Sequence, residues 1–303
     1  MNLSDIIKFY KVKYEKKVFF TKLSYKNAYI MYIYNTFEEY ENFSKTFLYY
    51  LPFYTRNNDF FENVEGELSD WLLKRSRNIR VDKTTIPDRN IENNGIYGEL
   101  FLDFYLRIVK KRELVITYMS KRSFNSNYES RGLDSLAYYF DNNGNICLNI
   151  CEAKFVCDQN SAKKDLLDDI NGTDKKIGHL TEEFFNQYYH FVVCEGSKMH
   201  EKEKIKFKQL IDELNKECDN GNKFLDVFIR HNVFFKVTFF AIFSCKLKEP
   251  EKLKEIYEKI YDEGKKKIEE MKIVNYEIEI VFIPTDHSSM EIKRKIEEEY
   301  ENK

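Results

Sequence analysis

Two carboxylates and one ammonium group occupy a short stretch of this chain, in which Asp134 is followed by Glu152 and Lys154. Between them lie two apolar runs, residues 136–140 and 146–150, separated by the polar sequence DNNGN. Because Asn-Gly in a polar cluster supplies the positive φ angles of a hairpin turn, we expect a strand, a turn and a strand. Symmetrical pairing about the turn places Asp134 opposite Glu152. Side chains alternate between the faces of a strand, so Lys154 should share the face of Glu152.

These residue types suit a divalent-metal site that cuts phosphodiester bonds. Magnesium usually takes one or two protein carboxylates together with waters and phosphate oxygens. Asp134 and Glu152 would supply the carboxylates, and the backbone carbonyl of Ala153 a third oxygen. The ion would lower the pKa of a bound water and offset charge on the scissile phosphate. Lys154 would position the attacking water or stabilise the negative charge of the transition state. We therefore expect Mg²⁺ as the cofactor, with Mn²⁺ able to substitute.

A structural role for the same residues is the alternative. Asp, Glu and Lys are common, and an Asp followed at a loose gap by Glu-x-Lys arises by chance in many sequences. An exposed ion pair at a sheet edge would contribute only about 0–1 kcal/mol. The expected hairpin favours the metal site, because its pairing places both acids on one face without adjustment.

An upstream segment, residues 95–111, supplies a further acid. Its apolar residues recur at helical spacing and predict an amphipathic helix; they are Leu100, Phe101, Phe104, Tyr105 and Ile108. Glu99 lies in the first turn, where it either complements the helix dipole or points at the hairpin as a third acid. Asp103, four residues on, shares roughly that face and could replace Glu99 in this role.

A helix acid, a strand Asp and a following Glu-x-Lys form the motif of the PD-(D/E)xK nucleases, which this chain resembles through Glu99, Asp134, Glu152 and Lys154. The resemblance implies an α/β (α+β) fold of the restriction-endonuclease-like type, with a mixed sheet flanked by helices. It also implies magnesium bound at the end of the sheet, with Glu99 joining the metal-binding acids. Leu133 stands where the proline of the family's name would be, a departure that leaves the metal chemistry intact.

More specifically, the chain resembles the HamA family, the nuclease subunits of the Hachiman anti-phage system. The resemblance rests on Tyr97-Gly98-Glu99 at the helix start, Gly132-Leu133-Asp134 before the strand, and an ending in which 276–284 is a strand followed by a short helix. It implies a DNA nuclease that a superfamily 2 helicase, HamB, holds inactive until abnormal or invading DNA is engaged. The chain has no P-loop motif, so it should not hydrolyse ATP itself.

Two other functions remain open. The chain could be a PD-(D/E)xK nuclease of another defence or restriction system, with a different sensor. It could also be a non-enzymatic adaptor or inhibitor subunit in which the acids are structural.

Length and composition bound the organisation of the chain. With 303 residues, 43% of them hydrophobic, it can form one large domain or two modest ones. We expect an N-terminal α+β module over residues 1–90, a linker near 84–94 and a nuclease core over 91–303. No apolar run of about 18 residues and no signal peptide are evident, so no membrane association is expected. The six cysteines lack a CxxC pair and should be reduced thiols in a cytoplasmic protein.

The remaining elements follow from periodicity, end signals and breakers. We expect strands at 28–34, 190–194, 234–245 and 276–284. We expect helices at 37–51, 180–189 and 201–217, a helix capped by Ser161 and running to 170, and a helix from Pro250 to 271.

The formal net charge of −2 gives no overall basic field that would attract nucleic acid. DNA contacts must come from local clusters, although such clusters are more often solvated surface. Contacts to DNA phosphates are made by Lys and Arg side chains. The candidates are Lys74, Arg75, Arg77 and Arg80 in one cluster and Lys121, Arg122 and Arg131 in a second. The modest charge predicts weak DNA binding by the chain alone and delivery or control by a partner.

Overall fold

A computed structural model describes residues 3–14, 18–23, 27–33, 39–55, 66–75 apart from 69 and 73, 95–116, 134–140, 145–185 apart from 175, 205–219, 224–245 and 250–301. The expected linker at 84–94 and the expected strand at 190–194 lie outside these residues.

The main sheet is mixed and has seven strands, in the order β1-β2-β9-β8-β5-β4-β3. Four neighbouring strands, β2, β9, β8 and β5, run parallel, and antiparallel pairs extend the sheet at both ends. The strands are β1 (Val18–Lys22), β2 (Ala28–Ile33), β3 (Glu113–Ile116), β4 (Ser135–Phe140), β5 (Ile146–Asp158), β8 (Phe234–Ser244) and β9 (Tyr276–Thr285). A separate ribbon pairs β6 (Gly172–Thr173) with β7 (Lys176–Ile177).

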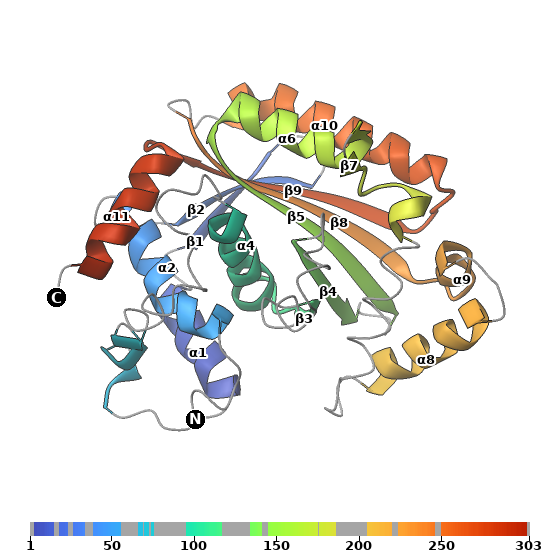
Figure 1. The fold of residues 1–303 in the computed structure, drawn as a ribbon, viewed down its shortest axis with the longest axis horizontal. Helices are drawn as coiled ribbons and strands as arrows, with labels where there is room; N and C mark the ends of the chain where they lie inside the picture. The colour runs from blue at the N-terminus through green and yellow to red at the C-terminus, as the bar shows by residue number, and fades with distance from the viewer. Residues whose placement is uncertain are drawn as a thin grey trace.

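Helices cover both faces of this sheet, as Figure 1 shows. On one face lie α6 (Gln159–Asn171) and α10 (Pro250–Glu270), and on the other α4 (Gly95–Phe104), continued by the π-helix η2 (Tyr105–Val109). Around α4 are α1 (Leu3–Tyr14), α2 (Glu39–Thr55) and α11 (Ser289–Glu301), while α8 (Ile205–Asp219) and α9 (Phe224–Arg230) lie at the opposite end of the sheet. The predicted mixed sheet flanked by helices is confirmed.

Alternation along β5 divides the core into two layers, because successive side chains point to opposite faces of a strand. Leu148 and Ile150 pack in the cluster under α6 and α10. Cys147 and Cys151 face the other way, and Cys151 joins the cluster that contains α4. The even-numbered residues of β5 therefore face α6, which decides where Glu152 and Lys154 must point.

The first two strands belong to the same sheet as the rest of the chain. β2 pairs in parallel with β9, with Ala28 opposite Ile280. The predicted division into residues 1–90 and 91–303 stays a prediction, since no described residue marks the boundary. The hydrogen bonds of β2 nevertheless join the N-terminal segment to the core that it was expected to precede.

Most of the expected elements are present where the structure describes them, including the two strands of the hairpin, the helix that begins at Pro250 and the strand expected at 276–284, which runs over Tyr276–Thr285. The predicted cap of α6 is wrong. Asp158, not Ser161, is the cap, and its carboxylate accepts hydrogen bonds from the backbone N–H groups of Asn160 and Ser161. Both residue types cap helices well, and β5 runs on to Asp158, so the helix begins earlier than the sequence pattern indicated. Of the expected helix at 180–189, residues 182–185 are described as helical.

Four cysteines have side chains that the structure describes. Cys147, Cys151, Cys157 and Cys245 are free thiols, and all but Cys157 are buried.

A buried ion cluster fixes β9 to the segment that follows α4. The carboxylate of Glu279, 1% exposed, lies 3.0 Å from Lys110 Nζ and 3.2 Å from Lys236 Nζ, with Arg112 Nη1 3.7 Å away. Burial raises the pKa of Glu279, but the three cations lower it by more, to about 2. The carboxylate is therefore ionised in the folded chain at any ordinary pH.

Glu279 should contribute to acid sensitivity. Its pKa is depressed on folding, so its stabilisation is present above the unfolded value near 4.5 and is lost as pH falls toward 2. The contribution at neutral pH is roughly 3 kcal/mol. The urea unfolding midpoint of Glu279→Gln should be lower than that of the wild type at neutral pH. It should also change less as the pH falls through this window. Glu255→Gln, which alters an exposed acid, should retain the wild-type profile. If the wild type and Glu279→Gln lost the same stability as the pH falls, Glu279 would not be the source of this acid sensitivity.

Candidate active site

The hairpin has the register that the sequence predicted. β4 pairs with β5 so that Ser135 lies opposite Cys151 and Phe140 opposite Ile146. Asp134 directly precedes β4, and its Oδ2 accepts a hydrogen bond of 2.6 Å from the backbone N–H of Ala153. The carboxylate of Asp134 is thereby held against the Glu-Ala-Lys segment at the open end of the hairpin.

Glu152 and Lys154 share one face of β5, as expected from strand alternation. Glu152 is buried, and its Oε2 lies 3.8 Å from Lys154 Nζ. Lys154 makes a closer ion pair, of 2.5 Å, with Oδ2 of Asp169 on α6. The structure thus brings together Asp134, Glu152, Ala153 and Lys154, and it adds a residue that sequence reasoning missed.

The ammonium of Lys154 is stabilised by its surroundings. Burial lowers the pKa of Lys154, but the carboxylates of Glu152, Asp134 and Asp169 together raise it by more, so the pKa stands above its usual value. Lys154 is therefore a cation across the physiological pH range. In that form it donates hydrogen bonds and cannot serve as a general base.

His179 is the second residue that the sequence did not reveal. Its Nδ1 lies 2.7 Å from Oε1 of Glu152. One donor atom each from Glu152, Asp169 and His179 fall within 4.8 Å of one another, and all three residues are buried.

Only one of these two missed residues had a signal in the sequence. Asp169 falls within the buried stripe of α6, among Ala162, Leu166 and Ile170. An acid at core spacing in a helix is unusual unless it is paired, so this position stood out in principle. His179 lies in a short loop after β7, where no periodicity applies, and nothing in the sequence linked it to Glu152.

The loop that carries His179 is locked onto the end of α6. The N–H of His179 donates a hydrogen bond of 2.6 Å to the carbonyl of Asp169. At Gly178, an added Cβ would lie 2.7 Å from Asn171 C, Gly172 N and Ile170 O. Only glycine allows this approach, because all three contacts are with backbone that cannot rotate away.

Gly178→Ala should displace the His179 loop and destabilise the chain by roughly 1–3 kcal/mol through overpacking. Chemical denaturation would measure the loss. Gly264→Ala in α10 is the matched control: its Cβ would meet side-chain atoms of Ile278 and Phe239 at 3.4 Å, and helix propensity favours alanine there. Equal stability of Gly178→Ala and wild type would show that the loop is not locked in this way.

The predicted helix acid, Glu99, belongs to α4, which packs on the face of β5 opposite to the Glu152 side chain. Helix α4 packs directly on β5 through Gly98, whose added Cβ would lie 3.3 Å from Lys154 C. Oε2 of Glu99 accepts a hydrogen bond of 3.1 Å from the hydroxyl of Tyr54 in α2. The role of Glu99 as a metal-binding acid stays a prediction.

Asp103, the alternative helix acid, is bound into the packing between helices. Its Oδ1 accepts a hydrogen bond of 2.5 Å from the hydroxyl of Tyr50 and lies 3.3 Å from Arg107 Nε. Asp103 is only 3% exposed. These contacts hold α4 against α2 and η2, and they favour a structural role for Asp103.

A comparison with models of protein families identifies the family of the chain. The HamA family model matches residues 7–299 of the 303-residue chain. The chain belongs to the HamA family. Membership in the HamA family supports a role in anti-phage defence, as the resemblance predicted. Searches of curated proteins and of solved structures returned no match.

The HamA match includes every strand of the sheet, from β1 to β9. It also includes α6 and the loop bearing His179, so Asp169 and His179 lie within the family region like the hairpin acids.

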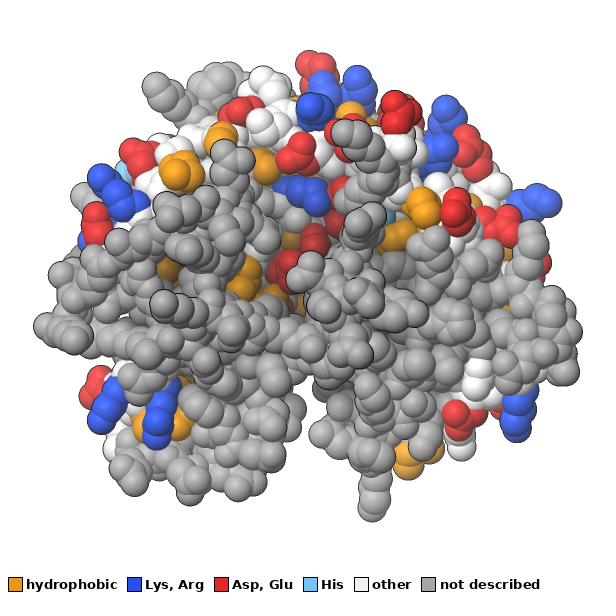
Figure 2. Space-filling model, viewed as in Figure 1, with side chains coloured by type: hydrophobic (Ala, Val, Ile, Leu, Met, Phe, Trp, Pro, Cys, Tyr) orange, Lys and Arg blue, Asp and Glu red, His pale blue; other side chains and the backbone are white. Residues whose placement is uncertain are grey.

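Predicted DNA contacts of this HamA chain fall partly within the described residues. Lys74 and Arg75 are exposed, and the guanidinium of Arg75 lies 5.3 Å from the centre of the Trp71 ring. The other predicted contacts, Arg77, Arg80, Lys121, Arg122 and Arg131, lie outside the described residues. Figure 2 shows side chains of both charges interspersed over α6 and α10, which agrees with the absence of a basic field in the composition. DNA binding stays a prediction.

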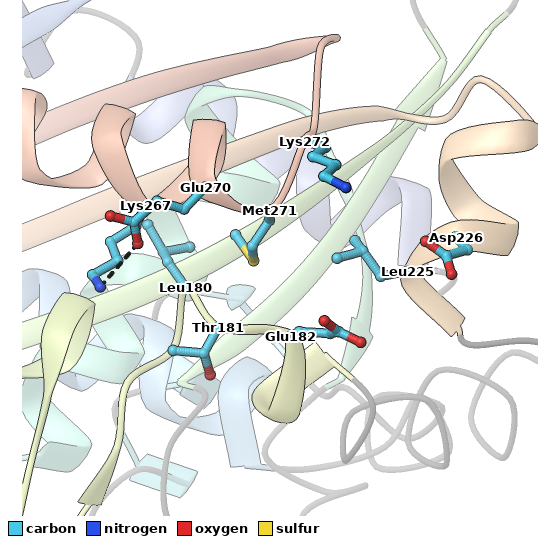
Figure 3. Close-up of a pocket in the computed structure, with 9 residues that line it drawn as sticks. All are labelled: Leu180, Thr181, Glu182, Leu225, Asp226, Lys267, Glu270, Met271 and Lys272. Atoms are coloured by element: carbon cyan, nitrogen blue, oxygen red, sulfur yellow. Dashed lines mark hydrogen bonds and ion pairs between the residues drawn. The ribbon is translucent and has the colours of Figure 1, made fainter.

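A pocket of about 430 Å³ lies beyond the His179 loop. Figure 3 shows Leu180 and Thr181, the two residues after His179, on one side and the end of α10 on another. Its charged lining residues are Glu182, Asp226, Lys267, Glu270 and Lys272. The hairpin acids are not among the lining residues, so the pocket is distinct from the candidate active site.

None of the described helices is both long and apolar enough to cross a bilayer.

Proposed function

We propose that this HamA-family chain is a metal-dependent DNA nuclease that hydrolyses phosphodiester bonds in anti-phage defence. The observation that carries the proposal is the meeting of Asp134, Glu152 and Lys154 at the open end of one hairpin, with Asp134 bonded to the N–H of Ala153. Two acids and a lysine in this arrangement match the chemistry of phosphodiester hydrolysis.

The donor set fits a hard divalent cation. Asp134 and Glu152 offer carboxylate oxygens and Ala153 offers its backbone carbonyl, which are the ligand types that magnesium accepts. Among the described side chains, the carboxylates of Asp134, Glu152 and Asp169 all act on the one ammonium of Lys154, so this group of residues carries excess negative charge. Buried charge is costly without a partner, and a divalent cation would offset it. When bound, the ion supplies an activated water and polarises the phosphate; Mn²⁺ should replace Mg²⁺.

The side chains around these acids have separate roles in the proposed reaction. Lys154, held cationic by three carboxylates, would orient the attacking water and stabilise charge on the phosphate oxygens. Asp169 fixes the position of its ammonium through the 2.5 Å ion pair. Glu99 would contribute a further acid from α4.

The proposed partners are DNA and a HamB-like superfamily 2 helicase that holds the nuclease inactive until it engages invading DNA. Family membership supports this control, and the net charge of −2 supports reliance on a partner for DNA delivery. A PD-(D/E)xK nuclease of another defence system would share the site but not this partner, and co-purification with the helicase would separate the two.

Cleavage of supercoiled plasmid by the purified chain tests the proposal. We expect nicked or linear product with Mg²⁺ or Mn²⁺, none with EDTA, and none from Asp134→Asn in either metal. Asp168→Asn, which alters a partly exposed acid of α6, is the control and should cut like the wild type. If the wild type is silent, the helicase, ATP and DNA are added. Silence there, from a folded chain, would overturn the nuclease and leave the adaptor function.

A further inference from the structure

Three metal-binding side chains converge from three separate parts of the fold. Glu152 comes from β5, Asp169 from α6 and His179 from the loop after β7. One donor atom of each lies within 4.8 Å of the others. Donors around one ion lie about 3–4 Å apart when metal–ligand bonds are about 2.1 Å long, so small side-chain adjustments would bring all three to a common ion.

The three side chains are held in place by their own backbone and neighbours. The His179 N–H is bonded to the Asp169 carbonyl, which ties the second and third ligands together. Phe184 covers the imidazole, with ring centres 4.6 Å apart. Glycine at 178 permits the close approach of the loop to the end of α6. A metal site needs ligands that are positioned before the ion arrives, and this one has them.

Charge also favours a cation at this place. Glu152, Asp169 and His179 are each 3% exposed or less. Lys154 is the cation that the structure shows among them, and it bonds one oxygen, Oδ2, of Asp169. The same ammonium lies 3.8 Å from Oε2 of Glu152, so a bound ion would share these two carboxylates with Lys154.

We propose that Glu152, Asp169 and His179 form a second divalent-cation site, which prefers a transition-metal ion such as Mn²⁺ to Mg²⁺. The preference follows from the imidazole, because nitrogen ligands suit first-row transition metals while magnesium favours oxygen. The site shares Glu152 with the proposed nuclease centre and in that respect rests on the proposed function. Its other two ligands lie outside the Asp-Glu-x-Lys motif.

The test is Mn²⁺ binding to the full chain after removal of metals with EDTA and dialysis. Loss of the free-ion electron paramagnetic resonance signal on titration gives stoichiometry and affinity, and pulsed measurements detect a nitrogen ligand by its coupling to the ion. We expect a tightly bound Mn²⁺ with nitrogen coupling that survives an equal concentration of Mg²⁺. His179→Ala should lower this affinity by about tenfold or more, equivalent to ~1.4 kcal/mol, and abolish the coupling. Asp169→Asn should weaken binding and keep the coupling.

Two controls make the result specific. His231 and Glu217 form a His–Glu pair, with 2.7 Å between Nε2 and Oε1, that lies away from the proposed site. His231→Ala removes this imidazole and should leave Mn²⁺ binding unchanged. Asp134→Asn should abolish plasmid cleavage yet retain the nitrogen-coupled Mn²⁺, so failure of the nuclease and failure of this site give different results. Absence of nitrogen coupling in the wild type, or unchanged Mn²⁺ affinity in a folded His179→Ala variant, would overturn the proposal.

Discussion

Glu152→Gln is expected to abolish DNA cleavage, by roughly 10³-fold or more, while the chain remains folded. The amide has the volume of the carboxylate, so the packing under α6 is preserved. It lacks the negative charge that would bind the cation, and Glu152 lies within 4 Å of both Lys154 and His179. Both the proposed nuclease centre and the second cation site lose a ligand in this one variant.

A matched substitution at a surface acid shows whether the loss of cleavage is specific to Glu152. Glu183→Gln alters an exposed acid just beyond the His179 loop, and it should cleave plasmid at the wild-type rate. Circular dichroism and a thermal melt would establish that each variant is folded. Cleavage at the wild-type rate by folded Glu152→Gln protein would remove the hairpin carboxylates from the mechanism.

Lys154→Met should destabilise the metal-free chain by about 3–5 kcal/mol and also abolish cleavage. Met keeps most of the side-chain volume, but Glu152, Asp134 and Asp169 lose the ammonium that they surround. Removing one partner of a buried charge group costs more than the pair itself contributes, because the remaining charges are left without compensation. Urea denaturation in EDTA would measure the loss. Added Mn²⁺ or Mg²⁺ should restore part of it by offsetting the carboxylates.

Two further substitutions test whether the lost charge causes the destabilisation of Lys154→Met. Lys154→Arg keeps the charge and should recover stability, but not full activity, because a planar guanidinium does not place its donors as an ammonium does. Lys164→Met, at an exposed position of α6, should be nearly neutral. If Lys154→Met were as stable as the wild type in EDTA, the carboxylates would not depend on this ammonium.

The hairpin could be predicted because its determinants are local. The Asn-Gly sequence, which lies outside the described residues, predicted a turn, and a register counted from that point places Ser135 opposite Cys151, as observed. The alternation of β5 then puts Glu152 and Lys154 on one face. The helix beginning at Pro250 and the strand at 276–285 were likewise predictable from a breaker residue and a periodic pattern.

Competing local signals explain the wrong cap of α6. Asp158 and Ser161 are both good capping residues, and Ser161 lies closer to the apolar stripe of α6. The length of β5 decides between them, and this length is set by its pairing with β8, in which Asp158 lies opposite Ser244. Long-range pairing of this kind leaves no mark in the local sequence.

The sequence by itself determined the residue types of the candidate centre, their order and the hairpin that joins Asp134 to Glu152 and Lys154. Tertiary structure alone decided which other side chains meet them. Asp169 reaches Lys154 because α6 packs on the even-numbered face of β5, and His179 reaches Glu152 because Gly178 lets its loop close on α6. Helix α4, which carries Glu99, packs on the other face of β5. A hairpin register depends on neighbouring residues, whereas the choice of face by a helix depends on the packing of the whole core.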